Sequence, residues 1–224
     1  MAEKKIATGD SEEILAKAQD FWTRYSKQIT IVLAVIVLGV GGWYGYKNFI
    51  VKPKTEKAID AMYKAEEYYR MDSLQKALNG DGINAGFLKV ISNYGGTDAA
   101  ELAHIYAADC YLRTGDFNNV IKQLKDYSTS QGQYQARAYK LLGDANSELG
   151  KNDEAISYYK KAGNHFTDDP FASSEYLFFA ASLSEKIGKT KEAIELYKEV
   201  RDKFPGTTAA FESEKYLAKN DVFN

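Results

Sequence analysis

The chain has 224 residues, of which 45% are hydrophobic and 27% are charged. Its net charge of -2 argues against a nucleic-acid-binding protein, which would usually carry a basic stripe and a high pI. A single cysteine, Cys110, excludes an intramolecular disulfide, so stability must come from packing. Three prolines among many Ala, Leu, Lys and Glu residues favour helix over strand.

An apolar run without a charge, residues 29–46, follows a charged N-terminal segment. It is long enough to cross a bilayer, and it ends in Trp43 and two tyrosines that suit an interfacial aromatic belt. We therefore expect a tail over residues 1–28, a transmembrane helix over residues 29–52 and the lipid bilayer as a partner. The rival interpretation is a cleaved signal peptide, but the long segment of mixed charge ahead of the run is unlike a short basic n-region.

The charges around the run leave its orientation open. Arg24 and Lys27 precede it, and the lysines that follow it are Lys47, Lys52, Lys54 and Lys57. Counting under the positive-inside rule leans toward a cytoplasmic C-terminal domain. Long segments translocate largely regardless of charge, however, so the rule loses force here.

Beyond Pro53, apolar residues such as Ile59 recur at three- and four-residue spacing and predict one amphipathic helix that ends near Gly80. The following "GDGINAG" lacks the acidic ladder of a calcium loop and is interpreted as a turn. A shorter helix, "FLKVISNY", is predicted to stop at Gly95, with Thr97 capping the next helix. The two helices are the expected first hairpin.

Three copies of one pattern follow. A small residue is followed seven positions later by a glycine and, nine positions after that glycine, by a bulky residue. The copies contain, in that order, Ala108, Gly115 and Leu124; Gly143, Gly150 and Tyr159; and Ala181, Gly188 and Tyr197. We interpret each copy as two antiparallel helices joined by a tight turn, and stacked pairs would bury a continuous core.

This pattern resembles that of the tetratricopeptide repeat family, most closely from Tyr139 to Pro170. It departs from the family at Asn146 and Ser184, where an aromatic residue is usual. The resemblance implies an all-α solenoid of about four helical hairpins over residues 53–206. A C-terminal capping helix is expected within residues 207–224, with Ala209, Phe211, Tyr216 and Leu217 packed on the last pair.

The sequence contains no pattern typical of an enzyme. His104 and Cys110 are six residues apart, which places them about 240° apart around a helix, so they cannot form a dyad. Asp169 is interpreted as the cap of a helix that begins at Pro170 rather than as a metal ligand. Because phosphate-binding loops and nucleophile elbows are also missing, we expect no enzymatic activity, no cofactor and no metal site.

Function is therefore expected on the concave face of the solenoid. Transferring the family's groove positions to the matching residues gives a set of partner-binding candidates on the first helix of each pair. They are Met62, Glu66, Tyr69, Arg70, Leu102, Ile105, Asp109, Leu112, Arg113, Arg137, Lys140, Asp144, Glu148, Glu175, Phe178, Ser182, Glu185 and Lys186. The set mixes apolar anchors with charges of both signs, which suits a polypeptide better than a polyanion or nucleic acid. The oligomeric state stays open.

The layout as a whole, with the stretch "ALNGDG…GFLKVISNYGGTDAAELAHIYAADCYLRTGDF", resembles the YfgM-like ancillary subunits of the bacterial Sec translocon. The resemblance implies an inner-membrane protein with a cytoplasmic tail and periplasmic repeats. Its partners would be Sec translocon subunits, translocating chains or periplasmic chaperones. Two other interpretations stay open: a cytoplasm-facing membrane adaptor, and an envelope-assembly scaffold.

Overall fold

A computed structural model describes residues 8–219, and side chains from Glu13 onward. The described chain is all-α, as predicted, and it forms two compact units, residues 1–53 and 54–224. The first unit contains α1 (Thr8–Tyr46) and a π-helical segment, η1 (Lys47–Val51). Because this segment leads directly into α2, helical backbone is continuous from the apolar run into the repeats.

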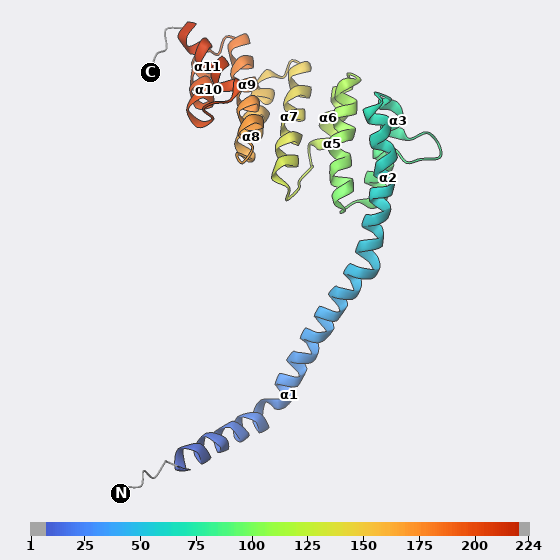
Figure 1. The fold of residues 1–224 in the computed structure, drawn as a ribbon, viewed down its shortest axis with the longest axis vertical. Helices are drawn as coiled ribbons and strands as arrows, with labels where there is room; N and C mark the ends of the chain where they lie inside the picture. The colour runs from blue at the N-terminus through green and yellow to red at the C-terminus, as the bar shows by residue number, and fades with distance from the viewer. Residues whose placement is uncertain (1–7, 220–224) are drawn as a thin grey trace. The chain divides into compact units, whose positions relative to one another are not determined.

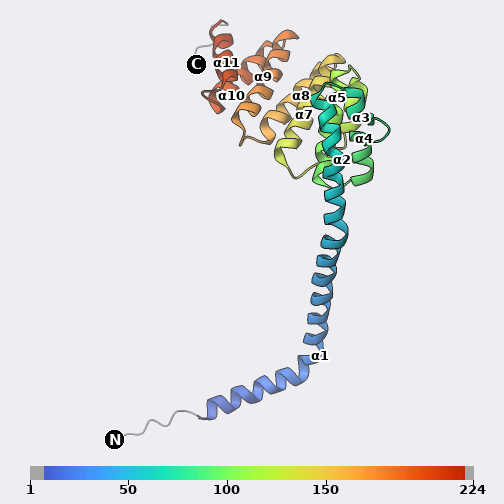
Figure 2. The ribbon, with the colours of Figure 1, turned by 45° about the vertical axis from the view of Figure 1, so that its right-hand side comes forward.

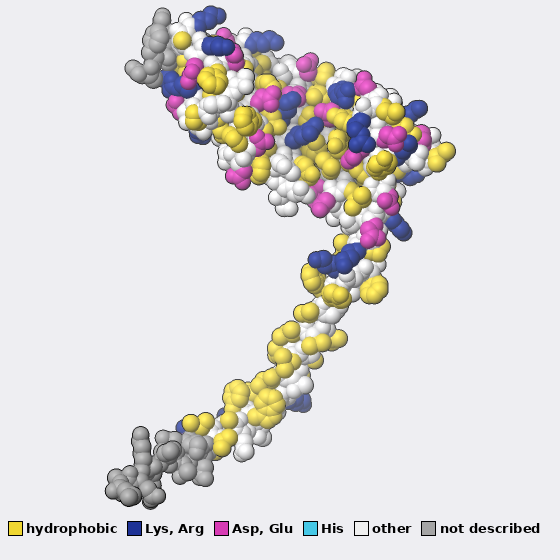
Figure 3. Space-filling model, viewed as in Figure 1, with side chains coloured by type: hydrophobic (Ala, Val, Ile, Leu, Met, Phe, Trp, Pro, Cys, Tyr) yellow, Lys and Arg dark blue, Asp and Glu magenta, His cyan; other side chains and the backbone are white. Residues whose placement is uncertain are grey.

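The apolar run in α1 contains no buried residue, and most of its side chains are exposed. Leu38 is 75% exposed, and no described residue covers the most apolar part of the helix. Hydrophobic side chains lie along all of it in Figure 3. A helix that is hydrophobic on all sides is normally buried in a core or in a membrane. Within the described residues, this is the one helix long and apolar enough to cross a bilayer.

The second unit is a row of helices (Figures 1 and 2). Its elements are α2 (Lys52–Arg70), α3 (Leu74–Asn79), α4 (Phe87–Tyr94), α5 (Asp98–Arg113), α6 (Phe117–Leu124), α7 (Gly132–Glu148), α8 (Asn152–His165), α9 (Pro170–Lys186), α10 (Thr190–Lys203) and α11 (Thr208–Lys219). The predicted repeats are the hairpins α5–α6, α7–α8 and α9–α10. Small buried residues line the contacts of α5 and α6 with α7, and a separate cluster of buried residues joins α8 to α9, α10 and α11.

All three hairpins turn by the same backbone motif. Gly115, Gly150 and Gly188 have φ of 77°, 72° and 78°, a left-handed conformation that favours glycine. The amide after each glycine donates to the carbonyl five residues earlier, as in a Schellman motif. These bonds join Asp116 to Tyr111 at 2.8 Å, Lys151 to Asn146 at 2.8 Å and Lys189 to Ser184 at 2.9 Å. The predicted role of these glycines is confirmed.

Asn146 and Ser184 are buried, although the family pattern has an aromatic residue at these positions. Each bonds the carbonyl one turn earlier: Asn146 Nδ2 donates to Leu142 O at 2.7 Å and Ser184 Oγ donates to Ala180 O at 2.8 Å. A buried polar group with a hydrogen-bond partner avoids most of the cost of desolvation. The departure from the family pattern is therefore compatible with the same hairpin.

The first hairpin is made by α2 and α4, with α3 inserted between them. The helices run antiparallel, because Lys54 Nζ donates to Gly95 O at one end while the rings of Tyr69 and Phe87 are in contact at the other. The prediction of one helix up to Gly80 is wrong. Asp72, with φ of 58°, ends α2 in a left-handed turn that short polar residues tolerate.

Two predicted core side chains face solvent instead. Ile59 is exposed because the buried stripe of α2 consists of Ala58, Met62 and Ala65. Phe211 of the capping helix α11 is 56% exposed. The buried stripe of α11 contains Ala210, Ser213 and Leu217, and Phe211 lies about 100° around the helix from Ala210.

The loop before α4 is held by one carboxylate. Asp81 Oδ1 accepts from the amides of Ile83 and Asn84 at 2.9 and 2.6 Å, and Oδ2 accepts from Tyr68 Oη at 2.5 Å. Asn84 Nδ2 also donates to Oδ2 at 2.9 Å. The interpretation of this segment as a turn is confirmed, because Gly80 and Ala85 form an antiparallel bridge across it.

This network predicts an unusual titration of Asp81. Hydrogen bonds from Tyr68 and Asn84 stabilise the ionised form and lower the pKa of the carboxyl well below its ordinary value of about 3.9. Because the folded-state pKa is depressed, the stabilisation is present above the unfolded pKa and is lost as pH falls through the folded pKa. We expect an NMR titration of the Asp81 carboxyl carbon to show a midpoint far below pH 3.9. The midpoint should rise in Tyr68→Phe, and an ordinary midpoint in the unaltered protein would contradict the network.

Candidate functional site

The first helices of the four hairpins are α2, α5, α7 and α9, and α11 follows the last hairpin. Three hollows lie between neighbouring members of this series. The first hollow is between α2 and α5, the second between α7 and α9, and the third between α9 and α11. The face predicted to bind a partner is therefore grooved.

The first hollow has a volume of about 270 Å³. Met62 is almost fully buried and forms part of its floor, while Ile59 and Tyr63 are exposed at its edge. Its other lining residues are Glu66, Asp98, Ala99, Leu102 and Tyr134. This hollow is mainly apolar and open.

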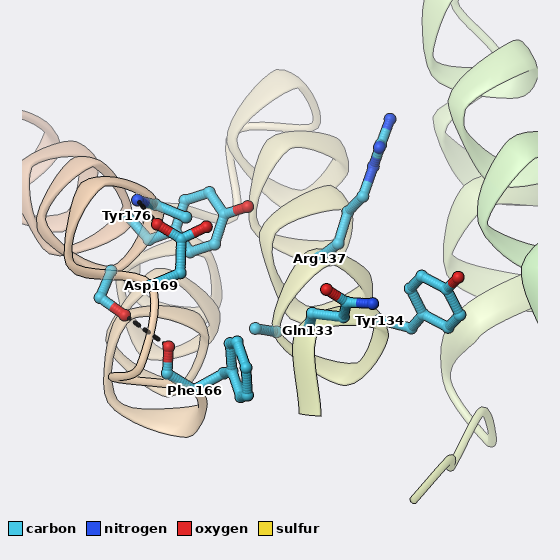
Figure 4. A pocket seen from close by; sticks show the side chains of 9 residues that line it. Gln133, Tyr134, Arg137, Phe166, Asp169 and Tyr176 are labelled. Carbon is cyan, nitrogen blue, oxygen red and sulfur yellow. Dashed lines mark hydrogen bonds between the residues drawn. The ribbon is translucent and has the colours of Figure 1, made fainter. Parts of the chain in front are cut away.

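The second hollow, of about 180 Å³, is drawn in Figure 4. Phe166 packs over Gly132, where a Cβ would come within 2.6 Å of the ring, and Phe166 O accepts from Ser173 Oγ at 3.0 Å. Arg137 extends away from Phe166, while Tyr134 points to the far side of α7 (Figure 4). Burial raises the pKa of Tyr176, so its phenol stays protonated and can donate.

The third hollow is the largest of the three, at about 500 Å³. Three aromatic side chains line it, and one of them, Phe171, is 68% exposed. Phe178 and Phe179 are held by contacts with the rings of Tyr197 and Tyr159. The charged residues that line it are Asp169, Glu175 and Glu212, with no Lys or Arg among its lining residues. This arrangement fits a large apolar side chain with basic neighbours.

Tyrosines hold several of the predicted polar site residues. Tyr69 Oη donates to Asp109 at 2.6 Å, and Tyr159 Oη donates to Asp144 at 2.9 Å. Burial is the main cause that raises the pKa of Tyr69 to about 12, and it also raises the pKa of Tyr159. These phenols are neutral donors at physiological pH. The carboxylates are therefore fixed in orientation and already partly satisfied.

Most basic groups of this face lie beside acidic or aromatic ones. Arg113 is 2.5 Å from Asp72 and lies over the ring of Tyr69, while Lys140 is 2.8 Å from Asp144. Charges of both signs in close pairs leave little net field to attract a polyanion. Hydrophobic side chains and charged side chains of both signs are intermixed on the face of the repeats drawn in Figure 3. Such a surface suits a polypeptide ligand.

Comparison with protein families agrees with this architecture. A model described as a tetratricopeptide repeat-like domain matches residues 19–133, a little more than half of the chain. A second model, a tetratricopeptide repeat, matches residues 177–207. The chain belongs to the tetratricopeptide repeat-like family. No curated protein matches it. Such repeats form protein–protein interaction modules that are typically non-catalytic.

The two matched ranges leave residues 134–176 between them. The tetratricopeptide pattern in the sequence is closest to that of the family in this part, and the structure has a hairpin there, α7–α8. Gly143 lies against Tyr159 so closely that a Cβ would be 2.6 Å from the ring. The close approach that the repeat pattern predicts is thus present in this hairpin as well.

One of the predicted groove residues is misplaced. Ile105 is 1% exposed and belongs to the core formed with Val120 and Leu141, so it cannot contact a partner. Ile105 lies on a side of α5 that packs against the buried residues of α6 and α7, and not on an exposed side of that helix. Leu112 is half-buried against the same core.

The remaining predicted residues divide into two groups. Of those that line a hollow, six lie in the three hollows described above: Met62, Glu66, Leu102, Arg137, Glu175 and Phe178. The other three line a fourth hollow, formed by α7, α8 and α9, and they are Asp144, Ser182 and Lys186. Those that lie outside these hollows but are partly or fully exposed are Tyr69, Arg70, Asp109, Arg113, Lys140, Glu148 and Glu185. Binding by any of them stays a prediction.

The sequence-based prediction missed several aromatic residues that line the three hollows. Tyr63, Tyr134, Phe171, Tyr176 and Phe179 all line a hollow. A usable signal exists for α9, where Phe171, Glu175 and Phe178 recur at four- and three-residue spacing on one face. No such signal identifies Tyr134, because its place between hairpins depends on how the helices stack.

Proposed function

We propose that this protein is a membrane-anchored protein–protein interaction module, held to the bilayer by α1, which binds polypeptides along the concave face of its repeats. The observation that carries the proposal is the apolar run of α1, which is exposed although the repeats have a complete core of their own. A folded repeat domain has no need of such a helix for its stability. A bilayer accounts for its composition.

We further propose that the module works beside the bacterial Sec translocon, with its repeats in the periplasm. The resemblance of the whole layout to YfgM-like subunits supports this assignment. A single span raises the local concentration of a weak binding site at the membrane, so modest affinity would suffice to receive emerging chains or to recruit periplasmic chaperones. Capture of unfolded segments also agrees with a groove that has separate apolar hollows.

A cytoplasm-facing adaptor is the second candidate, favoured by the lysines that follow the apolar run. Topology separates the two candidates. We would add protease to the outer side of intact inner membranes and follow a tag placed after the last residue. Clipping of the tag is expected for periplasmic repeats. Protection until the membrane is lysed would instead support the cytoplasmic adaptor.

The third hollow supplies a direct test of polypeptide binding. Replacing Phe171 with Asp should weaken capture of a translocating chain, because it removes an exposed aromatic anchor and places a hydrated carboxylate where the apolar side chain of the ligand would pack. Loss of a hot-spot aromatic typically costs about 2 kcal/mol or more, which corresponds to roughly a 30-fold loss of affinity. Affinity would be measured with the full chain and a fluorescent peptide that carries an aromatic residue between lysines.

Phe211→Asp is the matched control for this variant. Phe211 is also an exposed phenylalanine, but it lies on α11 outside the third hollow. Both variants should keep the circular dichroism of the unaltered protein. Equal affinity of the two variants would show that the third hollow does not bind the peptide.

A further inference from the structure

The part of α1 that precedes the apolar run has two distinct faces. At 100° per residue, Ile14, Leu15, Phe21, Trp22 and Tyr25 fall within an arc of about 120°. All five are exposed, with Trp22 at 60%, and the rings of Phe21 and Tyr25 are in contact at 4.9 Å. No described residue of the chain covers this face. It is too apolar to be an ordinary solvated tail.

The charged residues of the same segment lie on another side of the helix. Glu13, Lys17, Asp20, Arg24 and Lys27 occupy an arc of about 80° that does not overlap the apolar one. Lys17 Nζ and Glu13 form an ion pair at 2.8 Å, one turn apart. This segment is therefore a strongly amphipathic helix, although a count of the charges over residues 1–28 shows only that acids and bases are mixed.

The position of this face within α1 indicates what covers it. No loop separates Tyr25 from the apolar run, since α1 continues without interruption to Tyr46. If the run lies in the bilayer, the aromatic residues are within one or two helical turns of the hydrocarbon boundary. Trp, Tyr and Phe beside a charged face are typical of helices that lie in the membrane interface.

A change of helix direction between the two segments has a local cause. Thr30 Oγ1 donates to Ser26 O at 2.8 Å, and Thr23 Oγ1 donates to Gln19 O at 2.7 Å. Such bonds from Ser or Thr to the preceding turn bend helices. In Figures 1 and 2, α1 has two limbs that meet at a bend. One limb can therefore cross a bilayer while the other follows its surface.

We propose that residues 13–28 form an interfacial helix, whose apolar face inserts at the boundary between headgroups and acyl chains in the leaflet where the span begins. This inference rests on the proposed membrane anchor. Its ligand is the lipid surface itself. The near balance of acidic and basic residues on the polar face makes the apolar contact, and not attraction to anionic lipid, the main source of binding.

The chain has only two tryptophans, one in each segment, and they make the two proposals separable. In Trp43→Phe, Trp22 reports on the interfacial helix. In Trp22→Phe, Trp43 reports on the span. Each full-length variant would be reconstituted in phosphatidylcholine vesicles that contain lipids brominated at a shallow or at a deep position of the acyl chain. We expect blue-shifted emission from Trp22 and stronger quenching by the shallow bromines.

The outcomes distinguish the helix from the anchor. Quenching of Trp43 together with water-like, unquenched emission from Trp22 would overturn the interfacial helix and leave the anchor standing. Loss of both signals would overturn the anchor. Blue-shifted but unquenched emission from Trp22 that disappears as the protein is diluted in lipid would show contact between copies of the chain, and would also overturn the proposal.

A pair of charge variants in the Trp43→Phe protein tests the apolar face directly. Phe21→Lys places a charge within the apolar arc, and most of the quenching of Trp22 should be lost. Ala16→Lys adds the same charge outside that arc, about 140° around the helix from Phe21. Its quenching should match that of the parent. Equal quenching in the two variants would contradict insertion by this face.

Discussion

Arginine at both Val35 and Leu38 is expected to remove the protein from the membrane. Both side chains lie near the middle of the apolar run and are exposed. An arginine at the centre of a membrane helix costs about 2.5–3.5 kcal/mol on insertion scales, so two cost roughly 5–7 kcal/mol. The protein should move from the carbonate-resistant pellet to the supernatant. The helices of the repeats should persist, because their core contains no residue of the run.

The control places two arginines at the ends of the run, as Gln28→Arg with Asn48→Arg. Long side chains at these positions can reach the headgroups, so insertion should be retained. If the Val35/Leu38 variant still resists carbonate, α1 is not the membrane anchor. The proposed function would then have lost its main support.

Replacing Gly86 with alanine is expected to disrupt the first hairpin. A Cβ at this position would lie 2.4 Å from both Leu78 O and Gly80 N, and these are backbone atoms that cannot move aside as a side chain could. To relieve the clash, α3 must separate from the start of α4, where Leu78 and Phe87 are both buried. Overpacking of this kind costs roughly 1–3 kcal/mol and occasionally more, and we expect the upper end of that range.

The same loop supplies a control, Gly82→Ala. Gly82 has a φ of 93° but no atom near the position of a Cβ, so alanine there meets only the backbone penalty of about 1–2 kcal/mol. Urea unfolding of each full-length variant in detergent, followed by circular dichroism, would rank them. Gly86→Ala should be the less stable of the two. The reverse order would mean that the loop relaxes around the new methyl group.

A loosened first hairpin should also affect function. The first hollow is built from α2 and α5, and the aromatic contacts of Tyr69 and Tyr106 with Phe87 join both helices to α4. Disruption of α4 would therefore deform one end of the groove while the third hollow stays intact. The affinity of the third hollow for the peptide should therefore change little in Gly86→Ala. This result would show that the variant damages the first hairpin and not the peptide-binding hollow beside Phe171.

The strongest sequence-based predictions concern features with local causes. Gly115, Gly150 and Gly188 mark their turns because only glycine adopts a left-handed conformation without a steric penalty. The apolar run could be recognised from composition alone. In contrast, the break at Asp72 has no glycine or proline to mark it, and it was missed for that reason. The interfacial helix was missed because the charges of residues 1–28 were counted together. Its amphipathic character appears only when the positions of the residues around the helix axis are compared.

By itself, then, the sequence determined that this protein has a long apolar helix followed by helical hairpins, because both depend on short-range spacing and on turn chemistry. Only the tertiary structure decided which side chains remain available for a partner. Ile105 and Phe171 are both apolar residues on first helices, yet Ile105 is enclosed by the neighbouring hairpin while Phe171 lines a hollow beside α11. That difference depends on how successive helices pack, which the period of a single helix does not encode.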